Sequence, residues 1–344
     1  MTKYRIVALA LVGASMLACF GGGEVKTDAA EAQLESGDLA GAQSTYDGLA
    51  KDHPDAVNVA VGEAYMQMLA GQYDAADKTL QSVEDKAGDA VGEIKLRRAL
   101  VALRSGNLDD VKKYGKESGL PAGQVMAAEV HLADAEVDDA ITLLKEAKSD
   151  PGDVGSTAQT YLTMLESGDA LQAGLAEATA LWAVGQRGVA CEVAEEIVKA
   201  LPDNGDKGEQ LLLWAGRAVT SGRSGIATSL LDELDLVGAP QGQEWRVQAT
   251  RGLVFIAEGQ NDEGIARFKA LDAAIDAGFA PWQGVADATA TAAALTQDKP
   301  TARALLQGSE GVPAARGLYA AGAGKLARNA APNDSVFASF LENK

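Results

Sequence analysis

The sequence contains little cysteine and little histidine. Its 344 residues include two of each: Cys19, Cys191, His53 and His131. So few cysteines exclude a disulfide framework, and Cys191, in the run Ala-Cys-Glu-Val-Ala, is predicted to be a small buried apolar residue. Neither histidine has a cysteine, histidine or carboxylate neighbour at the spacing of metal ligands. No metal, cofactor or catalytic residue is predicted, and we expect a protein that is not an enzyme.

Aromatic residues and positive charge are also scarce. Aromatic side chains make up 5% of the chain, and 30 basic residues stand against 49 acidic ones, giving a formal net charge of −19. Abundant alanine with few aromatic residues favours closely packed helices over sheets. Nucleic-acid binding is disfavoured, because clustered basic side chains hold phosphates. The charge suits a partner with a basic surface or segment, or it serves solubility alone.

The N-terminus carries a short apolar run. This run, Ile6–Val12, is far shorter than the roughly 20 residues that span a bilayer. It follows Lys3 and Arg5, and a small residue, Ala18, lies beyond it. A basic start, a brief apolar run and a small residue before a cleavage point predict a secretory signal.

The end of this signal, Met16–Cys19, resembles the lipobox of bacterial lipoproteins. The resemblance implies removal of residues 1–18 and a lipid on Cys19, which begins a glycine-rich tether over residues 19–27. Lipoproteins retained in the inner membrane often carry aspartate after that cysteine, whereas this chain has Phe20. The resemblance therefore implies a periplasm-facing anchor in the outer membrane. An ordinary secretory signal with a coincidental cysteine is the alternative.

A turn followed by a small residue and then a larger one recurs along the chain. Gly37 is followed by Ala42 and Tyr46, and the same order returns 34 residues later. The turn glycine can end a helix in the left-handed conformation, and the small residue lets the second helix approach the first. The eight turns begin at Gly37, Gly71, Gly106, Ala135, Gly185, Gly222, Gly259 and Gln297. Prolines fall between the proposed helices, where they cost least.

This unit resembles the tetratricopeptide repeat, a helix pair of 34 residues. The resemblance implies an all-α fold, an α-solenoid of about eight helical hairpins, with N-terminal units over residues 28–155 and degenerate units over 156–344. A longer gap after the fourth turn leaves room for an extra helix, Ser156–Glu166. Val312–Arg328 is predicted to cap the stack, with Ser335–Leu341 packing against it. A generic alanine-rich helical bundle is the alternative.

Such a stack offers a concave surface lined mainly by the first helix of each pair, where peptides dock. The candidate partner-binding residues on these helices are Tyr65, Met68, Arg97, Arg104 and Trp182. The aromatic residues have an alternative interpretation as interhelix core, and the arginines as a solvated face or as partners of acids. Trp214 and Trp245 are predicted to pack between neighbouring helices.

These features favour a non-catalytic, lipid-anchored scaffold that brings other proteins together at the bacterial cell envelope. Lipoproteins of this kind resemble accessory subunits of outer-membrane assembly, pilus or secretion, or cell-wall complexes, and nothing in the sequence selects among these. One alternative is a helical module associated with a cell-wall lytic enzyme. Another is a solute-binding lipoprotein, which would need two strand-rich lobes.

Overall fold

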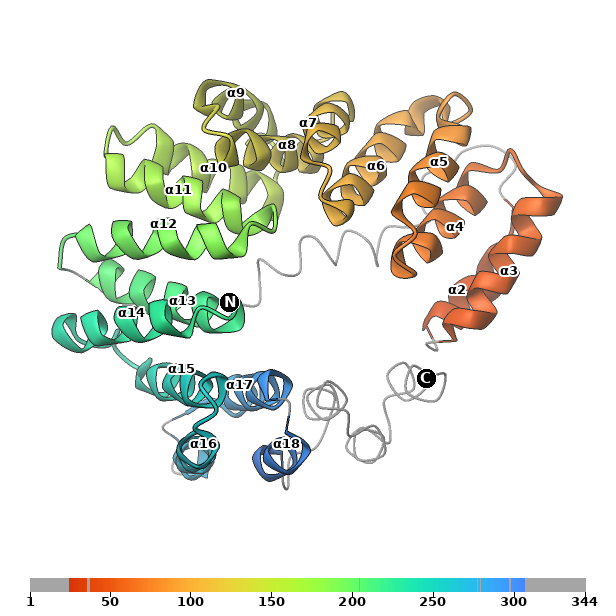
Figure 1. Ribbon diagram of the computed structural model, residues 1–344. Coiled ribbons are helices and arrows are strands. Elements are labelled where there is room, and N and C mark those ends of the chain that lie inside the picture. Colours follow the sequence, from red (N-terminus) through yellow and green to blue (C-terminus); the bar gives the residue numbers. More distant parts are fainter. Residues whose placement is uncertain are drawn as a thin grey trace. The chain divides into compact units, whose positions relative to one another are not determined.

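The described part of the chain folds into helices. The computed structural model describes residues 25–35, 38–203, 205–276, 278, 280–296 and 298–306. These residues form 17 α-helices and one short 3-10 helix, with no strand among them (Figure 1). The predicted all-α class is confirmed. The predicted signal, Cys19, and the predicted helices Val312–Arg328 and Ser335–Leu341 lie outside the described residues.

The chain divides into two compact units after Gln186. The first unit contains α2 (Asp28–Glu35), α3 (Leu39–Asp52), α4 (Val57–Leu69), α5 (Tyr73–Glu84), η1 (Gly88–Ala90), α6 (Val91–Ser105), α7 (Leu108–Glu117), α8 (Pro121–Ala133), α9 (Val137–Ala147), α10 (Asp153–Leu165) and α11 (Ala170–Ala183). The second contains α12 (Arg187–Ala200), α13 (Gly205–Thr220), α14 (Ser224–Val237), α15 (Glu244–Ala257), α16 (Asn261–Asp276), α17 (Trp282–Leu295) and α18 (Lys299–Leu305). The division between regular and degenerate repeats at residue 155 stays a prediction.

Successive helices within each unit pack as the predicted hairpins. In the first unit α2 packs on α3, α4 on α5, α6 on α7 and α8 on α9; in the second, α13 packs on α14, α15 on α16 and α17 on α18. The extra helix predicted at Ser156–Glu166 is α10, which packs against α8, α9 and α11. Neighbouring pairs in the first unit share a core: buried residues of α4 and α5 pack with Ile94 and Val101 of α6.

The turns within the hairpins use left-handed backbone, as the repeat predicts. Gly106 ends α6 with φ of 79°, and the Asn107 N–H donates to the Ala102 carbonyl at 2.9 Å. At the fourth turn Ala135 takes the same conformation, with φ of 60°. This backbone conformation costs a residue with a side chain about 1–2 kcal/mol, so the fourth hairpin is closed under local strain.

Small residues bring the paired helices together at the positions that the repeat predicts. The small residues that follow the turns are completely buried at Ala42, Ala76, Val111, Ala140, Ala190, Ala227 and Ala302. The larger residues four positions further on are also buried, for example Tyr46 and Phe268. A Cβ added to Gly62 of α4 would lie 2.0 Å from the ring of Tyr46. The close helix packing therefore depends on specific small residues.

A buried arginine ties three helices of the first unit together. Arg98 of α6 donates to Asp77 at 2.7 Å, to Glu84 at 2.6 Å and to the Tyr114 hydroxyl at 2.6 Å. Its guanidinium carbon lies 4.1 Å from the centre of the Tyr114 ring. Burial lowers the pKa of Arg98, but the hydrogen bonds that the guanidinium donates to Asp77 and Glu84 outweigh burial and raise it. The hydrogen-bond partners of Arg98 thus lie on α5 and α7, on either side of its own helix.

The second unit has a core of aliphatic residues around one tryptophan. Trp214 of α13 is 1% exposed, which confirms its predicted packing between helices. Cys191 of α12 is free and buried, as predicted, with its Sγ 3.5 Å from the Ser221 hydroxyl. Burial raises the pKa of the Cys191 thiol, which keeps it protonated and unreactive. None of the described helices combines the length and apolar character needed to cross a membrane.

Candidate functional site

The five predicted partner-binding residues do not form one cluster. Tyr65 of α4 is half-buried, and Arg104, exposed in the last turn of α6, acts on it electrostatically. Burial raises the pKa of the Tyr65 hydroxyl and the Arg104 charge opposes this, so these two side chains are brought near each other. Met68 is half-buried against the core of α4, α5 and α6, and Trp182 is half-buried on α11. A role in binding stays a prediction for these residues.

Arg97 is an inward residue. It is 8% exposed, and its Nη2 donates to Glu93 one turn earlier on α6 at 2.7 Å. Burial lowers the pKa of Arg97, and Glu93 opposes that effect. Its interpretation as the partner of an acid is therefore confirmed. As a cation for a docked protein it has little accessible surface.

The prediction that His131 lacks carboxylate neighbours is wrong. The left-handed turn at Ala135 lets the Glu136 N–H donate to the His131 carbonyl at 2.8 Å, which folds the start of α9 back beside the ring. The ring Nδ1 lies 2.6 Å from the Glu136 carboxylate, and ligand atoms of His131, Glu136 and Asp139 lie within 4.8 Å of one another. Helical spacing of residues gives no hint of a contact made across a turn.

A lysine occupies the position beside this cluster where a cation would be expected. Lys112 Nζ lies 2.6 Å from Glu136 and 2.6 Å from Asp134. Hydrogen bonds from Lys112, and then from His131, lower the pKa of Glu136. Lys112 and His131 thus already hold the Glu136 carboxylate, so this part of the cluster belongs to an ion-pair network within the protein.

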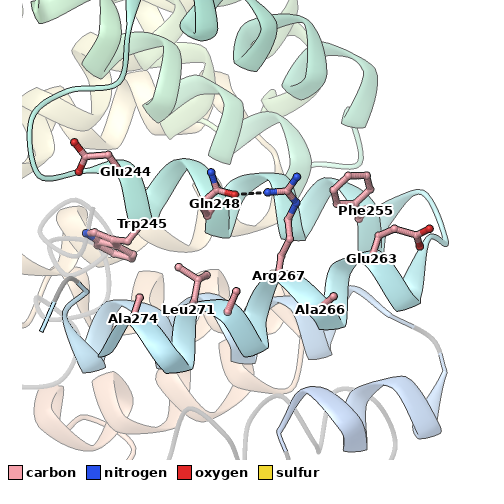
Figure 2. A pocket seen from close by; sticks show the side chains of 10 residues that line it. Glu244, Trp245, Gln248, Phe255, Glu263, Ala266, Arg267, Leu271 and Ala274 are labelled. Atoms are coloured by element: carbon pink, nitrogen blue, oxygen red, sulfur yellow. Dashed lines mark hydrogen bonds between the residues drawn. The ribbon is translucent and has the colours of Figure 1, made fainter. Parts of the chain in front are cut away.

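The second unit contains an elongated groove on one hairpin. It has a volume of about 730 Å³ and lies between α15 and α16 (Figure 2). Its larger apolar lining residues are Trp245, Phe255 and Leu271. The remaining lining residues are Glu244, Gln248, Glu263, Ala266, Arg267, Ala270 and Ala274. Its walls therefore combine bulky rings on α15 with small side chains on α16.

The sequence of α16 explains the hollow. Its core stripe includes Gly264 and Phe268, both buried, and a Cβ added to Gly252 of α15 would lie 2.9 Å from the Phe268 ring. The adjoining stripe carries Ala266 and Ala270, spaced one turn apart on the same face. Because the core stripe holds the helices close while the alanines fill little space beside it, a groove remains open along the hairpin.

Arg267 crosses the middle of the groove. Its guanidinium donates to the Gln248 side-chain carbonyl and lies 5.1 Å from the centre of the Phe255 ring (Figure 2). No carboxylate of the described residues forms an ion pair with it. Its positive charge is therefore held by a neutral amide and an aromatic face, which leaves donors on the guanidinium for a bound group.

The sequence predicts Trp245 as a residue packed between helices but does not predict that it also lines a groove. Its ring contacts Gly284 of α17, where an added Cβ would lie 2.4 Å away, so the predicted packing between helices is confirmed. The ring also lines the groove. The available signal was the spacing of Glu244, Gln248 and Phe255, which share one face of a helix. That signal does not distinguish an open face from a covered one.

The lining residues of the groove suit binding better than covalent chemistry. The ten of them, all in the described α15 and α16, include no histidine, cysteine, serine or threonine. Covering apolar surface of this kind with another apolar surface is favourable by about 25 cal/mol per Å² of area removed from water. The charged groups on the groove can then orient the bound molecule.

Comparisons with known proteins show a likeness to solved structures and none to a family profile or a curated protein. No protein-family profile matches the chain, and a search of curated proteins finds no relative of it. Among solved structures the chain is similar to one titled "Crystal Structure of P58(IPK) TPR Domain at 2.5 A", with 16% identity, 91% of this chain and 94% of that chain covered, and a TM-score of 0.23.

Proposed function

We propose that the protein is a non-catalytic scaffold that holds other proteins at a bacterial cell envelope through the α15/α16 groove. The observation that carries this proposal is an apolar groove of about 730 Å³ on a hairpin whose neighbours are closely packed. Stacked helical hairpins commonly serve as docking surfaces for peptides and helices. The described residues hold no strand, so no observation favours a solute-binding protein with two strand-rich lobes.

A lipid on Cys19 anchors this scaffold in the outer membrane, facing the periplasm. The support is the order of Lys3, Arg5, the apolar run and Met16–Cys19 in the sequence. The partners are envelope proteins with a basic surface or segment, because the chain carries a formal net charge of −19. The protein then acts as an accessory subunit of an outer-membrane assembly, pilus or secretion, or cell-wall complex.

Photo-crosslinking in cells that produce the protein tests the docking function. A photoreactive amino acid replaces Ala266, which is exposed in the groove, or Ala200, which is exposed at the end of α12 and does not line it. We expect specific protein adducts from position 266 and none from position 200. Equal adducts at both positions, or none at either, would contradict docking in the groove.

Labelling with a fatty-acid analogue tests the anchor separately. The chain offers a matched pair of variants, since Cys19 and Cys191 are its two cysteines. We expect the wild type and Cys191→Ser to incorporate the label and to sediment with membranes. Cys19→Ser is expected to do neither. A wild-type chain without label would remove the anchor and leave the groove proposal standing.

A further inference from the structure

The Arg267 side chain separates two apolar areas in the groove. In Figure 2 Trp245 and Ala274 lie toward one end, whereas Phe255 and Ala266 lie toward the other, with Arg267 between them. A bound molecule that uses the whole groove must therefore bury apolar groups on both sides of the guanidinium. The group opposite Arg267 must be small or must offer a hydrogen-bond acceptor.

The distance between the two areas matches a helix in the partner. Ala266 and Ala274 are eight residues apart on α16, which corresponds to a rise of about 12 Å. Two apolar side chains seven residues apart on a second helix are separated by about 10.5 Å and lie on one face. A helix lying along α15 and α16 could thus place one apolar side chain on each side of Arg267.

The charges around the groove indicate which charged side chains this helix carries at its ends. Glu244 is exposed at one end, and Glu258, Asp262 and Glu263 are exposed near the turn between α15 and α16 at the other. None of these four carboxylates forms an ion pair with a described residue. Basic side chains at both ends of a bound helix would complement them, whereas acidic ones would be repelled.

We propose that the groove binds an amphipathic helix of a partner protein, with two apolar side chains about seven residues apart and lysine or arginine at both ends. This proposal rests on the proposed docking function and adds the chemistry of the partner. The helix buries its apolar face against Trp245, Leu271 and Phe255, as helix-in-groove complexes do. Glu244 and Glu263 select the basic ends.

Synthetic peptides test the proposal with the full chain in detergent. The probe is a fluorescein-labelled helical peptide of about 20 residues, with two leucines seven residues apart on an alanine face and lysines at both ends. One control peptide has glutamates in place of the lysines, and another has serines in place of the leucines. Fluorescence anisotropy measures binding, and we expect the first peptide to bind at least about tenfold more tightly than either control, a difference of about 1.4 kcal/mol.

Matched protein variants show whether the peptide occupies the groove. Ala270→Phe fills the groove from an exposed position, whereas Ala200→Phe makes the same change at an exposed position of α12 that does not line it. We expect the first to weaken binding about tenfold and the second to leave it unchanged, with unaltered helical circular dichroism in both. Glu244→Lys with Glu263→Lys is expected to weaken the lysine peptide about fivefold, less at high salt.

The outcomes separate this proposal from the docking function. If the glutamate peptide binds as well as the lysine peptide, or if Ala270→Phe leaves binding intact, the proposed helix is wrong. Groove adducts from the photo-crosslinking experiment would still support docking of another kind of partner. A third outcome is that the peptides fail to bind, whereas the apolar dye 8-anilinonaphthalene-1-sulfonate binds to the wild type and not to Ala270→Phe. The groove is then a small-molecule pocket and the proposal is overturned.

Discussion

Arg98 and Arg267 each lie over an aromatic ring in hairpins of one design, and their surroundings differ. Arg98 in the first unit lies 4.1 Å from the Tyr114 ring and is bonded to two carboxylates. Arg267 in the second unit lies 5.1 Å from the Phe255 ring and is bonded to the neutral Gln248. Arg98 links α6 to α5 and α7 through hydrogen bonds, whereas Arg267 lines an open groove. A repeat can thus use the same residue type for stability or for binding, depending on its carboxylate partners.

The largest effect expected from this comparison is on stability. Arg98→Met leaves Asp77 without its cation and leaves Glu84 with Lys95 alone, at 3.7 Å, so we expect a loss of stability of about 3 kcal/mol. Arg267→Met removes no ion pair and keeps apolar contact with Phe255, so we expect a loss below about 1 kcal/mol. Urea unfolding of the full chain, followed by circular dichroism, measures both. Equal losses of stability in the two variants would show that the two arginines contribute equally to the folded state and would contradict the comparison.

Glycine substitutions sharpen the comparison of packing. Gly62→Ala drives a methyl group to 2.0 Å from the buried Tyr46 ring, and we expect a loss of about 2–3 kcal/mol. Gly252→Ala meets the Phe268 ring at 2.9 Å, so a smaller loss of about 1–2 kcal/mol is expected. Gly48→Ala on α3, with nothing within 4 Å, is the control and should gain up to about 1 kcal/mol. A neutral Gly62→Ala would contradict the packing described for α3 and α4.

Stability of the first unit is expected to depend on pH through Glu129. Burial raises the pKa of the Glu129 carboxyl from 4.5 to about 7, and the hydrogen bond from Tyr161 at 3.1 Å opposes this. The folded state binds the Glu129 proton more tightly than the unfolded chain does. The contribution of this proton to the free energy of unfolding is therefore complete below about pH 4.5 and is lost as pH rises to about 7. At pH 8 we expect Glu129→Gln to be more stable than the wild type by about 2 kcal/mol.

Unfolding at pH 4 and pH 8 checks the Glu129 prediction. The stability difference between Glu129→Gln and the wild type should be near zero at pH 4, where both states of the wild type are protonated. A constant difference across this range would mean that Glu129 ionises as readily in the folded protein as in the unfolded chain.

The smallest expected effects concern the turns. Ala135→Gly relieves a left-handed backbone conformation, and we expect a gain of about 1 kcal/mol. Gly259→Ala introduces the same strain at the turn between α15 and α16, where φ is 77°, and should lose about 1 kcal/mol. Thermal unfolding of the two variants provides the measurement. A loss on Ala135→Gly would imply that the alanine side chain makes a stabilising contact.

The sequence predicts the architecture better than the site, for a physical reason. Positions such as Ala42 and Ala227 follow a turn by a fixed number of residues, and local spacing determines whether they face the partner helix. The contact between His131 and Glu136 is made across a turn, so helical spacing does not reveal it. The groove depends on which face of α15 stays uncovered, and that is decided by how α13, α14, α16 and α17 pack around it, which helical spacing within α15 does not reveal.

Hydrogen exchange of the full chain, with and without the lysine peptide, tests the central claim most directly. The groove account predicts slower amide exchange within α15 and α16 and unchanged exchange in α4 and α6, where Tyr65 and Arg104 lie. Protection confined to α4 and α6, with α15 and α16 unaffected, would contradict the groove as the docking site. That result would instead place the partner on the first-helix surface of the first unit.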